Sequence, residues 1–592
     1  MDGETVDRVF IPRDDPEACR HGARPGLTRR PLRRRIVAVL RGERGAVVRR
    51  PHGIVGCCVI LLVAALPAYS ARAAVASSAL VVHTTSGAVA GILYGSEKEW
   101  RGVPYAAPPV GGLRWRPPAP VTPWSGVRDA TVFAPPCIQL DFISGGTLGS
   151  EDCLYLNVFA PSNATATSRL AVLVHLHPGS NSGYHAYRDA AAFTARGVIV
   201  VTVGYRLGVF GFVGHAALTA EGGGSSGEYG LLDQLAALRW VRDNIASFGG
   251  DPSRVTLFGS SAGSFDTAAL MASPLSQGLI TRAAVQGDVQ WGLTGAGNTI
   301  SDAEQIGLQV SQHVGCESAA SVLACLRATP AADLVEAAGP LDIVPWIGGA
   351  VLPKSPLELV RERRTVPLLV GFDREEEAAL QGNPLDSPYP ADKWVKDTNA
   401  LVGPDLGVQA RSLYPPSAYD SLLWSYITMR TDAVRGCPTR RLANAVQAPV
   451  YRYLYTHVYE NDPFFAQFRA SHILEDPLLW GSDIFGFGHI FTPAEQLLSQ
   501  KMADYWTNFA KTGNPNGPGL ATWPAYNPNG EPTLTLDDQV GVATNYHDQQ
   551  CALLDTIPFL YPAPWAQGFR RGLASVPPGF LEGHARAFPS SG

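Results

Sequence analysis

Two short apolar runs separated by an amphipathic helix constrain the fold of this chain more than any other feature. Residues 198–205 (VIVVTVGY) are rich in β-branched side chains, which predicts a buried strand. In residues 231–248, apolar side chains recur at spacings of three and four, which predicts a helix that Gly249 and Gly250 end. A second buried strand is predicted at 255–258 (VTLF). Apolar strands that flank a helix are typical of a parallel sheet covered on both faces, so the predicted fold class is α/β.

Composition and charge limit the class of protein. Of the 592 residues, 46% are hydrophobic and 17% are charged, which predicts a globular protein with a large core. The formal net charge is −5, but residues 1–73 hold 14 of the 47 basic and 7 of the 52 acidic groups, so the remaining chain carries −12. Binding to phosphate groups needs a basic surface, so nucleic acid is not an expected partner.

The N-terminal segment has the order of a secretory signal. Thirteen apolar residues, 54–66, follow an arginine-rich stretch and precede A-R-A at 71–73, a small-residue cleavage site. We therefore expect a leader at 1–73, cleaved near Ala73 or after Ala76, and a secreted or extracytoplasmic mature protein. A membrane anchor is the alternative, but a bilayer needs about 20 apolar residues, so no stable anchor is expected. The basic stretch is long for a signal, so either translation starts later or the signal is extended.

Behind the leader the chain shows no repeat or long linker. One domain is therefore predicted at 74–565, followed by a Pro/Gly-rich tail at 566–592. Six of the nine cysteines lie behind the leader, an even number, as expected of disulfides in an exported protein. They form no C-x-x-C pair and the chain holds no H-E-x-x-H, so neither a metal nor another cofactor is expected. The residues alone do not choose among the 15 pairings that six cysteines allow.

The candidate nucleophile lies where the strand at 255–258 ends. Residues 259–263 read G-S-S-A-G, which matches G-x-S-x-G between a strand and a helix. In this motif the nucleophile sits on a turn so sharp that the residues two before and two after it must lack bulk, and glycines fill both places. The turn lifts the Ser261 hydroxyl above the sheet and points the amide of Ala262 at the same spot. The alternative, a loop without chemistry, is disfavoured by the flanking strand and helix.

Several further stretches resemble type-B carboxylesterases, the α/β-hydrolase family that includes cholinesterases. The stretches that carry the resemblance are G-V-P-Y-A at 102–106, S-E-D-C-L-Y-L-N-V at 150–158, Y-R-L-G at 205–208, G-L-L-D-Q-L-A-A-L-R-W-V at 230–241, F-G-G-D-P at 248–252 and W-T-N-F-A-K-T-G at 506–513. The resemblance begins near Val81 and covers nearly all of the chain behind the leader. It implies an α/β-hydrolase fold, with a large, mostly parallel central sheet and helices on both faces, and hydrolysis of carboxylic esters within one catalytic domain.

A serine nucleophile needs a base and an orienting acid, which follow it in the order Ser, Asp or Glu, His in this fold. Glu376 is the predicted acid. It follows the apolar run at 366–372 in G-F-D-R-E-E, which is similar to the family's G-x-N-x-D-E-G, although Glu377 stands where that pattern has its last glycine. Glu375 and Glu377 stay open as alternatives.

The predicted base is His472, one of five histidines that follow Glu376. It lies in A-S-H-I-L-E at 470–475, which is similar to the family's A-x-H-x-x-E/D stretch. A lone histidine is more often a surface or core residue than a base, so His489, in G-H-I-F, is kept only as a second candidate.

The oxyanion of the tetrahedral intermediate needs amide donors. The loop H-P-G-S at 177–180 occupies the place of the family's H-G-G-G, and the resemblance implies that Gly179 and Ser180 donate together with Ala262. Pro178, which has no N–H, then falls on the position that does not donate, so the oxyanion hole is expected to survive. We expect the Ser180 side chain to narrow the acyl pocket or to require an altered backbone angle.

Three other departures from the family concern the surroundings of these residues. Ser260 replaces the glutamate that usually precedes the nucleophile, Glu228 replaces the asparagine of G-N-x-G-L-x-D, and residues 286–287 (Q-G) replace Q-S-G. With one carboxylate fewer nearby, the imidazolium form of His472 is expected to be less stabilised than in relatives. We expect activity and substrate range, rather than fold, to be affected.

The resemblance also pairs the six cysteines behind the leader. It implies three disulfides: Cys137 with Cys153, Cys316 with Cys325, and Cys437 with Cys551. In cholinesterases the first of these loops holds a tryptophan that faces quaternary ammonium groups by cation–π contact. Residues 138–152 hold no tryptophan, so choline esters are disfavoured as substrates.

Together these residues predict a secreted serine carboxylesterase that forms an acyl-enzyme and acts on a small-molecule ester. Ser261 is the predicted nucleophile, His472 the base and Glu376 the orienting acid. A non-catalytic binding or adhesion protein on the same fold is the alternative, and a lipase of the same family is another. Acyl length, alcohol size and oligomeric state are not predicted.

Overall fold

The computed structural model of the protein describes residues 80–557 except 142–145, 288, 290–298, 340, 342, 364, 380–387 and 485–488. The chain divides into Met1–Ala73 and Ala74–Gly592, and every described residue belongs to the second part. The predicted leader, its cleavage near Ala73 or Ala76 and the predicted tail at 566–592 therefore lie outside the described residues.

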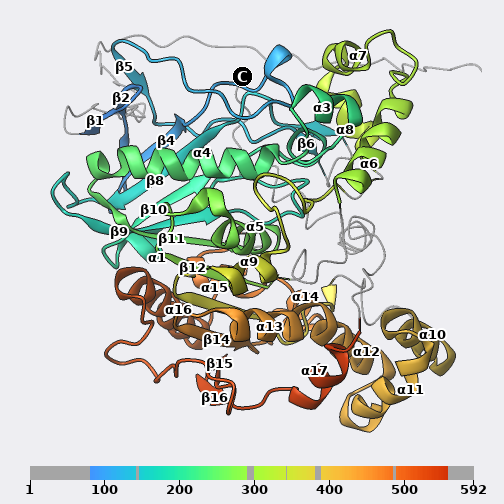
Figure 1. The fold of residues 1–592 in the computed structure, drawn as a ribbon. Helices are drawn as coiled ribbons and strands as arrows, with labels where there is room; N and C mark the ends of the chain where they lie inside the picture. Colours follow the sequence, from blue (N-terminus) through green and yellow to red (C-terminus); the bar gives the residue numbers. More distant parts are fainter. Residues whose placement is uncertain are drawn as a thin grey trace, which may run out of the picture. The chain divides into compact units, whose positions relative to one another are not determined.

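An eleven-stranded mixed sheet forms the centre of the fold (Figure 1). Its middle is parallel, as the sequence predicts, and contains β10 (Ile199–Val203), β9 (Leu170–Leu176), β11 (Gly250–Ser260), β12 (Arg282–Gln286), β13 (Leu368–Asp373), β14 (Val450–Tyr455) and β15 (Thr533–Leu536). The edges are antiparallel and contain β8 (Tyr155–Pro161), β4 (Glu97–Pro104) and β3 (Ile92–Tyr94) on one side and β16 (Gly541–Ala543) on the other. Two small sheets lie outside it: β1 (Val81–Thr84), β2 (Gly87–Ala90) and β5 (Val127–Asp129) form one, and β6 (Gln139–Leu140) and β7 (Thr147–Leu148) form the other.

Successive residues of the central strands enter two different cores, because side chains alternate between the faces of a sheet. In β9, Val172 and Val174 join the core on one face and Leu173 joins the core on the other. The first face is covered by α4 (Tyr229–Asn244), α5 (Ala262–Ala272) and α9 (Pro356–Glu362). The second is covered by α1 (Ala191–Thr194), α15 (Glu475–Trp480) and α16 (Pro493–Thr512). The α/β-hydrolase fold is thus confirmed.

The helix expected at 231–248 is present but has two parts. The α-helix α4 ends at Asn244, and a 3-10 turn, η3 (Ile245–Phe248), continues it to Gly249, whose φ of 94° ends the turn. The strand expected at 255–258 is the inner part of the longer β11. Residue 261 follows β11 directly, so the candidate nucleophile lies at the carboxyl end of a parallel strand.

Most remaining helices lie in the connections between strands. They are α2 (Gly208–Gly211), α3 (Ala216–Glu221), α6 (Ile300–His313), α7 (Val322–Ala328), α8 (Ala331–Ala338), α10 (Ala391–Val402), α11 (Pro404–Leu413), α12 (Leu422–Thr431), α13 (Cys437–Ala445), α14 (Pro463–Ala466) and α17 (Asp548–Leu554). Helices α10, α11, α12 and α17 share a small core of their own. Among the residues that the structure describes, no helix has the length and apolar character that crossing a membrane requires.

Candidate active site

Ser261 stands between β11 and α5 in a strained turn. Its φ of 54° and ψ of −125° lie outside the regions that side chains usually adopt. The turn needs the flanking glycines: a Cβ added to Gly263 would lie 2.1 Å from the carbonyl oxygen of Leu176, and one added to Gly259 would lie 2.5 Å from the backbone of Gly263. The crowding predicted from the G-x-S-x-G sequence is therefore present.

The structure brings together the three residues that the sequence singled out as nucleophile, base and acid. The hydroxyl oxygen of Ser261 lies 2.8 Å from Nε2 of His472, and Nδ1 of His472 lies 2.5 Å from Oε2 of Glu376. The second oxygen of Glu376 accepts the N–H of Asp373 at 2.9 Å, which fixes the carboxylate. All three side chains are buried. This continuous hydrogen-bonded chain can draw a proton from a serine hydroxyl.

The two alternative acids are engaged elsewhere. Glu375 pairs with Nε of Arg374 at 2.7 Å, and Glu377 pairs with Nε of Arg430 at 2.6 Å. Glu376, between them, is the carboxylate that faces His472.

The loop after β9 has a left-handed backbone at three consecutive residues. The φ values are 113° at Gly179, 55° at Ser180 and 53° at Asn181. The carbonyl of Gly179 accepts the amides of Ser182 and Gly183, which closes a tight turn. Within the part of the chain that the structure describes, the amides of Gly179, Ser180 and Ala262 donate to no acceptor. Three such N–H groups are what an oxyanion hole requires.

Side chains from β6 and α5 hold this loop. The amide group of Gln139, in β6, donates to the carbonyl of Tyr184 at 2.8 Å and accepts the N–H of Tyr184 at 2.5 Å. Nδ2 of Asn181 donates to Asp266 of α5 at 3.1 Å, and burial raises the pKa of Asp266 to about 7. Gln139 and Asp266 were not found from the sequence, because their role depends on contacts across the fold.

His177, the first residue of this loop, has a neutral imidazole ring. Burial lowers the pKa of His177 to about 3, and its ring stacks on Tyr205 with 4.4 Å between the ring centres. The Tyr205 hydroxyl donates to the carbonyl of His177 at 2.9 Å. The ring therefore acts as a packed support of the loop rather than as a proton carrier.

The structure also explains two of the departures from the family pattern. The carboxylate of Glu228 accepts the amides of Ala350 and Val351 at 3.0 and 2.9 Å, so it anchors a loop. The hydroxyl of Ser260 donates to Asp476 at 2.6 Å. Asp476 thus places a carboxylate from a different part of the chain next to Ser260, and the expectation of a less stabilised His472 imidazolium stays a prediction.

An open pocket lies beside the loop that carries Ser180. Its wall is mainly apolar and is formed by residues of β6, the start of α2, the end of α8 and the segment after it, including Leu140, Leu207, Val209, Val335, Leu341 and Ile343. Such a lining suits an uncharged organic group.

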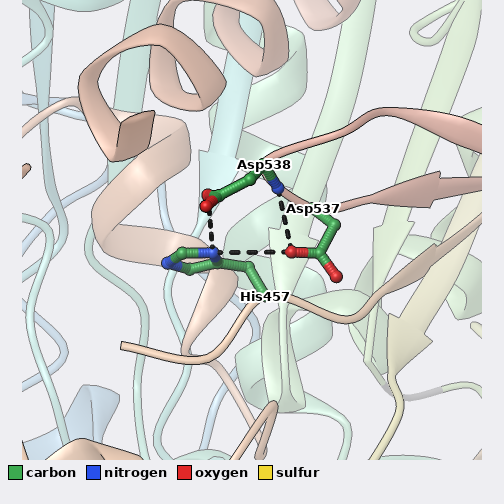
Figure 2. A group of neighbouring side chains, drawn as sticks. All are labelled: His457, Asp537 and Asp538. Atoms are coloured by element: carbon green, nitrogen blue, oxygen red, sulfur yellow. Dashed lines mark hydrogen bonds and ion pairs between the residues drawn. The ribbon is translucent and has the colours of Figure 1, made fainter. Parts of the chain in front are cut away.

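One group of side chains outside this site has the spacing of cation ligands, and Figure 2 shows it. Nδ1 of His457 lies 3.2 Å from Asp538 and 3.7 Å from Asp537, and its Nε2 lies 3.3 Å from Glu495. Burial disfavours the charged ring, but hydrogen bonds to Asp537 and Glu495 raise the pKa of His457 to about 9. These contacts suit an imidazolium held by carboxylates, and a metal ion would have to displace its proton. His489, the second candidate for the base, lies 3.1 Å from Glu495 in the same network.

The six cysteines are joined in the pairs that the family resemblance implies. The structure contains disulfides between Cys137 and Cys153, between Cys316 and Cys325, and between Cys437 and Cys551. Their sequence separations are 16, 9 and 114 residues. The first bridge lies next to Gln139, which holds the oxyanion loop.

Comparisons with known proteins agree with this geometry. The model of the carboxylesterase family matches residues 78–554. Carboxylesterase 1C of Rattus norvegicus is 34% identical over 503 residues, which cover 76% of this chain and 88% of that protein. Cocaine esterase of Oryctolagus cuniculus is 34% identical over 459 residues, covering 72% and 85%.

Among solved structures, a PNB esterase is 33% identical with a TM-score of 0.68 and covers 80% of this chain and 99% of its own. A carboxylesterase of Geobacillus stearothermophilus is 29% identical with a TM-score of 0.69 and covers 80% and 100%.

Proposed function

The chain belongs to the carboxylesterase family and is a carboxylic-ester hydrolase, and we propose that it is a secreted serine esterase that works through a covalent acyl-enzyme. The observation that carries the mechanism is the hydrogen-bonded chain from Ser261 through His472 to Glu376. Its order and contacts are those that nucleophilic catalysis by a serine requires.

In the first half of the reaction, the Ser261 hydroxyl oxygen attacks the carbonyl carbon of the ester while its proton moves to Nε2 of His472. Glu376 accepts a hydrogen bond from the Nδ1–H of the ring, which holds the productive tautomer and stabilises the imidazolium. When the tetrahedral intermediate collapses, His472 returns the proton to the leaving alcohol and the acyl group stays on Ser261. In the second half, a water molecule takes the place of the alcohol, and the same transfers release the acid.

The amides of Gly179, Ser180 and Ala262 are the proposed donors to the oxyanion. None of the described residues accepts a hydrogen bond from these amides, which supports this role because they can donate to an oxyanion. The left-handed backbone at Gly179 and Ser180 turns the loop back on itself, and Gln139 braces it.

The substrate is proposed to be a small ester whose uncharged part occupies the apolar pocket beside Ser180. The described part of this wall contains no tryptophan and no carboxylate to face a quaternary ammonium group, so choline esters are not the proposed substrates.

Three disulfides are consistent with an extracellular or luminal protein. Export through a signal in residues 1–73, followed by one catalytic domain at 74–565 and a tail at 566–592, is the organisation that we propose. N-terminal sequencing of the exported protein tests the cleavage site near Ala73.

The first prediction concerns the nucleophile. Ser261→Ala should lower ester turnover by roughly 10⁴-fold or more and leave the thermal unfolding nearly unchanged, because the change removes the reacting hydroxyl and keeps the Cβ. A fluorophosphonate probe should label the wild-type protein and the exposed-site control Ser412→Ala, but not Ser261→Ala. Labelling of Ser260 or Ser264, or no labelling of a folded wild-type sample, would contradict the assignment.

A further inference from the structure

The carboxylate of Asp476 occupies a place next to the nucleophile that the reaction described above does not use. On the premise of the proposed function, we propose that Asp476 is a positioning residue for Ser261 and His472 and that it supplies a second negative charge to the imidazolium form of His472. Ser260 is its partner in this role. The pair replaces a carboxylate that the family carries on the chain position before the nucleophile.

The contacts of Asp476 join the two strand ends that form the nucleophile turn. One carboxylate oxygen accepts the hydroxyl of Ser260, the last residue of β11, at 2.6 Å. The other accepts Nε2 of Gln286, the last residue of β12, at 3.4 Å. The amide of Ser261 in turn donates to the carbonyl of Gln286 at 3.0 Å. A single carboxylate therefore binds the side chains of Ser260, which precedes Ser261, and of Gln286, whose carbonyl accepts the amide of Ser261.

The position of Asp476 in the chain connects this turn with the base. Asp476 lies in the first turn of α15, and His472 lies in the loop that leads into that helix. The amide of Asp476 donates to the carbonyl of Ile473, the residue after the base, at 3.1 Å. The contact between Asp476 and Ser260 therefore joins the segment that carries His472 to the residue before Ser261, and the two catalytic side chains lie 2.8 Å apart.

The side chain is 1% exposed, so its charge acts with little screening by solvent. Burial raises the pKa of Asp476 to about 6, although the hydrogen bond from Ser260 and the nearby Arg188 and His472 each lower that pKa. In its ionised form, this carboxyl group can stabilise a positive His472.

Other charged and titratable groups lie near Asp476 and His472 and also contribute to the pH dependence of the site. The carboxyls of Asp373 and Glu475 lie behind the base, and burial raises the pKa of Glu475 to about 8. Several charged and titratable side chains lie around Asp476, His472 and Glu376. They are Arg188 after β9, Tyr184 in the loop that follows His177, Glu377 after β13, Arg435 in the π-helical turn before α13, Tyr453 of β14, and Asp373 and Glu475.

The test is the pH profile of kcat/KM for a nitrophenyl acetate, measured from pH 4.5 to 9 on the full exported protein. Asp476→Asn keeps an oxygen that can accept the Ser260 hydroxyl but removes the charge. It should move the acid limb of the profile by about one unit to lower pH, because the imidazolium loses a stabilising charge, and it should lower the plateau kcat by about 10- to 100-fold. Ser260→Ala keeps the charge and removes the hydrogen bond, so the plateau should fall by about 3- to 10-fold with the limb in place.

Two further variants sharpen the result. The double variant Ser260→Glu with Asp476→Ala restores a carboxylate, now at position 260 instead of position 476. The acid limb of its pH profile should therefore move back towards the wild-type position. Asp405→Asn, which removes an exposed carboxylate on α11, is the matched control and should leave the profile unchanged.

An Asp476→Asn protein that loses thermal stability but keeps the acid limb would show a structural role alone and overturn the proposal, as would an unchanged profile. If that variant does not fold, a Ser260→Ala enzyme with wild-type kcat would overturn the positioning role. A wild-type protein without ester turnover or probe labelling would instead contradict the proposed function, so the two failures are distinguishable.

Discussion

Ser180 carries a side chain at a backbone conformation that normally favours glycine. Its φ is 55°, it follows Gly179 in the oxyanion loop, and it lines the apolar pocket. A non-glycine residue held in this region costs roughly 1 kcal/mol or more, which the rest of the loop must offset. The bracing contacts from Gln139 and Asn181 fit that requirement.

The second prediction follows from this position. Ser180→Gly should keep turnover on acetyl esters and raise kcat/KM about 3- to 10-fold on longer acyl groups, since the amide donor stays, strain is released and volume is gained. A series of nitrophenyl esters of increasing acyl length measures the effect. Ser180→Ala is the matched control, because it removes the hydroxyl but keeps the Cβ and the strained backbone.

The opposite result would identify a different donor. If the Ser180 hydroxyl itself binds the oxyanion, both Ser180→Gly and Ser180→Ala should lose about 10²- to 10³-fold in kcat at every acyl length. A uniform loss of that size would reject the steric role.

The limits of sequence reasoning are clear at this scale. Ser261, His472 and Glu376 could be selected from local patterns, because each lies in a short motif whose residues are neighbours along the chain. Asp476 and Ser260 are 216 positions apart, and no local pattern pairs them. The sequence shows that residue 260 is not a carboxylate, but only the tertiary contact reveals the carboxylate of Asp476 beside it.

At the scale of elements, the ends of β14 and β15 meet in a cluster of opposite charges (Figure 2). His457 follows β14, and Asp537 and Asp538 follow β15. Despite the cost of burial, the hydrogen bond from His457 lowers the pKa of Asp537 to about 2. The cluster ties the carboxyl ends of two parallel strands together and, through Glu495, ties both to the start of α16.

The third prediction is a pH dependence of stability. The pKa of His457 is about 9 in the folded protein and near 6.5 in an unfolded chain, so the folded state binds the proton more tightly. The stabilisation is complete below about pH 6.5 and is lost as the pH rises through 9. Between these values the wild-type protein should lose about 1 to 3 kcal/mol more unfolding free energy than His457→Gln.

Urea denaturation at pH 6.5 and 9.5 measures the difference. His83→Gln, which changes an exposed histidine on β1, should behave like the wild type. Equal pH dependence of the wild type and His457→Gln would show that the cluster does not hold the extra proton.

Sequence periodicity located the inner elements of the fold but not the outer ones. The strands β10, β11, β13 and β14 and the helix α4 are long or strongly apolar, so their patterns are visible. Helices such as α7 and α8 have seven and eight residues, and their stability comes from packing against distant parts of the chain. The antiparallel strands at the sheet edges depend on partners far along the chain, which a local pattern does not specify.

For the whole molecule, the Cys437–Cys551 disulfide connects the last described helix with the body of the fold. Cys437 starts α13 and Cys551 lies in α17, and both are fully buried in the small core shared by α10, α11, α12 and α17. Within the described part of the chain, this core is separate from the two cores beside the central sheet. The bridge therefore fixes a region whose own apolar core is small.

The last prediction compares this bridge with a short one. The chain-entropy model relates the stabilisation to the length of the closed loop. For a separation of 114 residues it gives about 5 kcal/mol, and for the 9 residues between Cys316 and Cys325 it gives about 3 kcal/mol. The double variant Cys437→Ala with Cys551→Ala should thus lose about 2 kcal/mol more unfolding free energy than the matched double variant Cys316→Ala with Cys325→Ala.

Urea denaturation measures the unfolding free energy of both double variants, and peptide mapping without reductant checks each bridge in the wild type. Equal losses of unfolding free energy would show that the length of the closed loop does not set the stabilisation. Free thiols at Cys437 and Cys551 in exported protein would show that the bridge does not form.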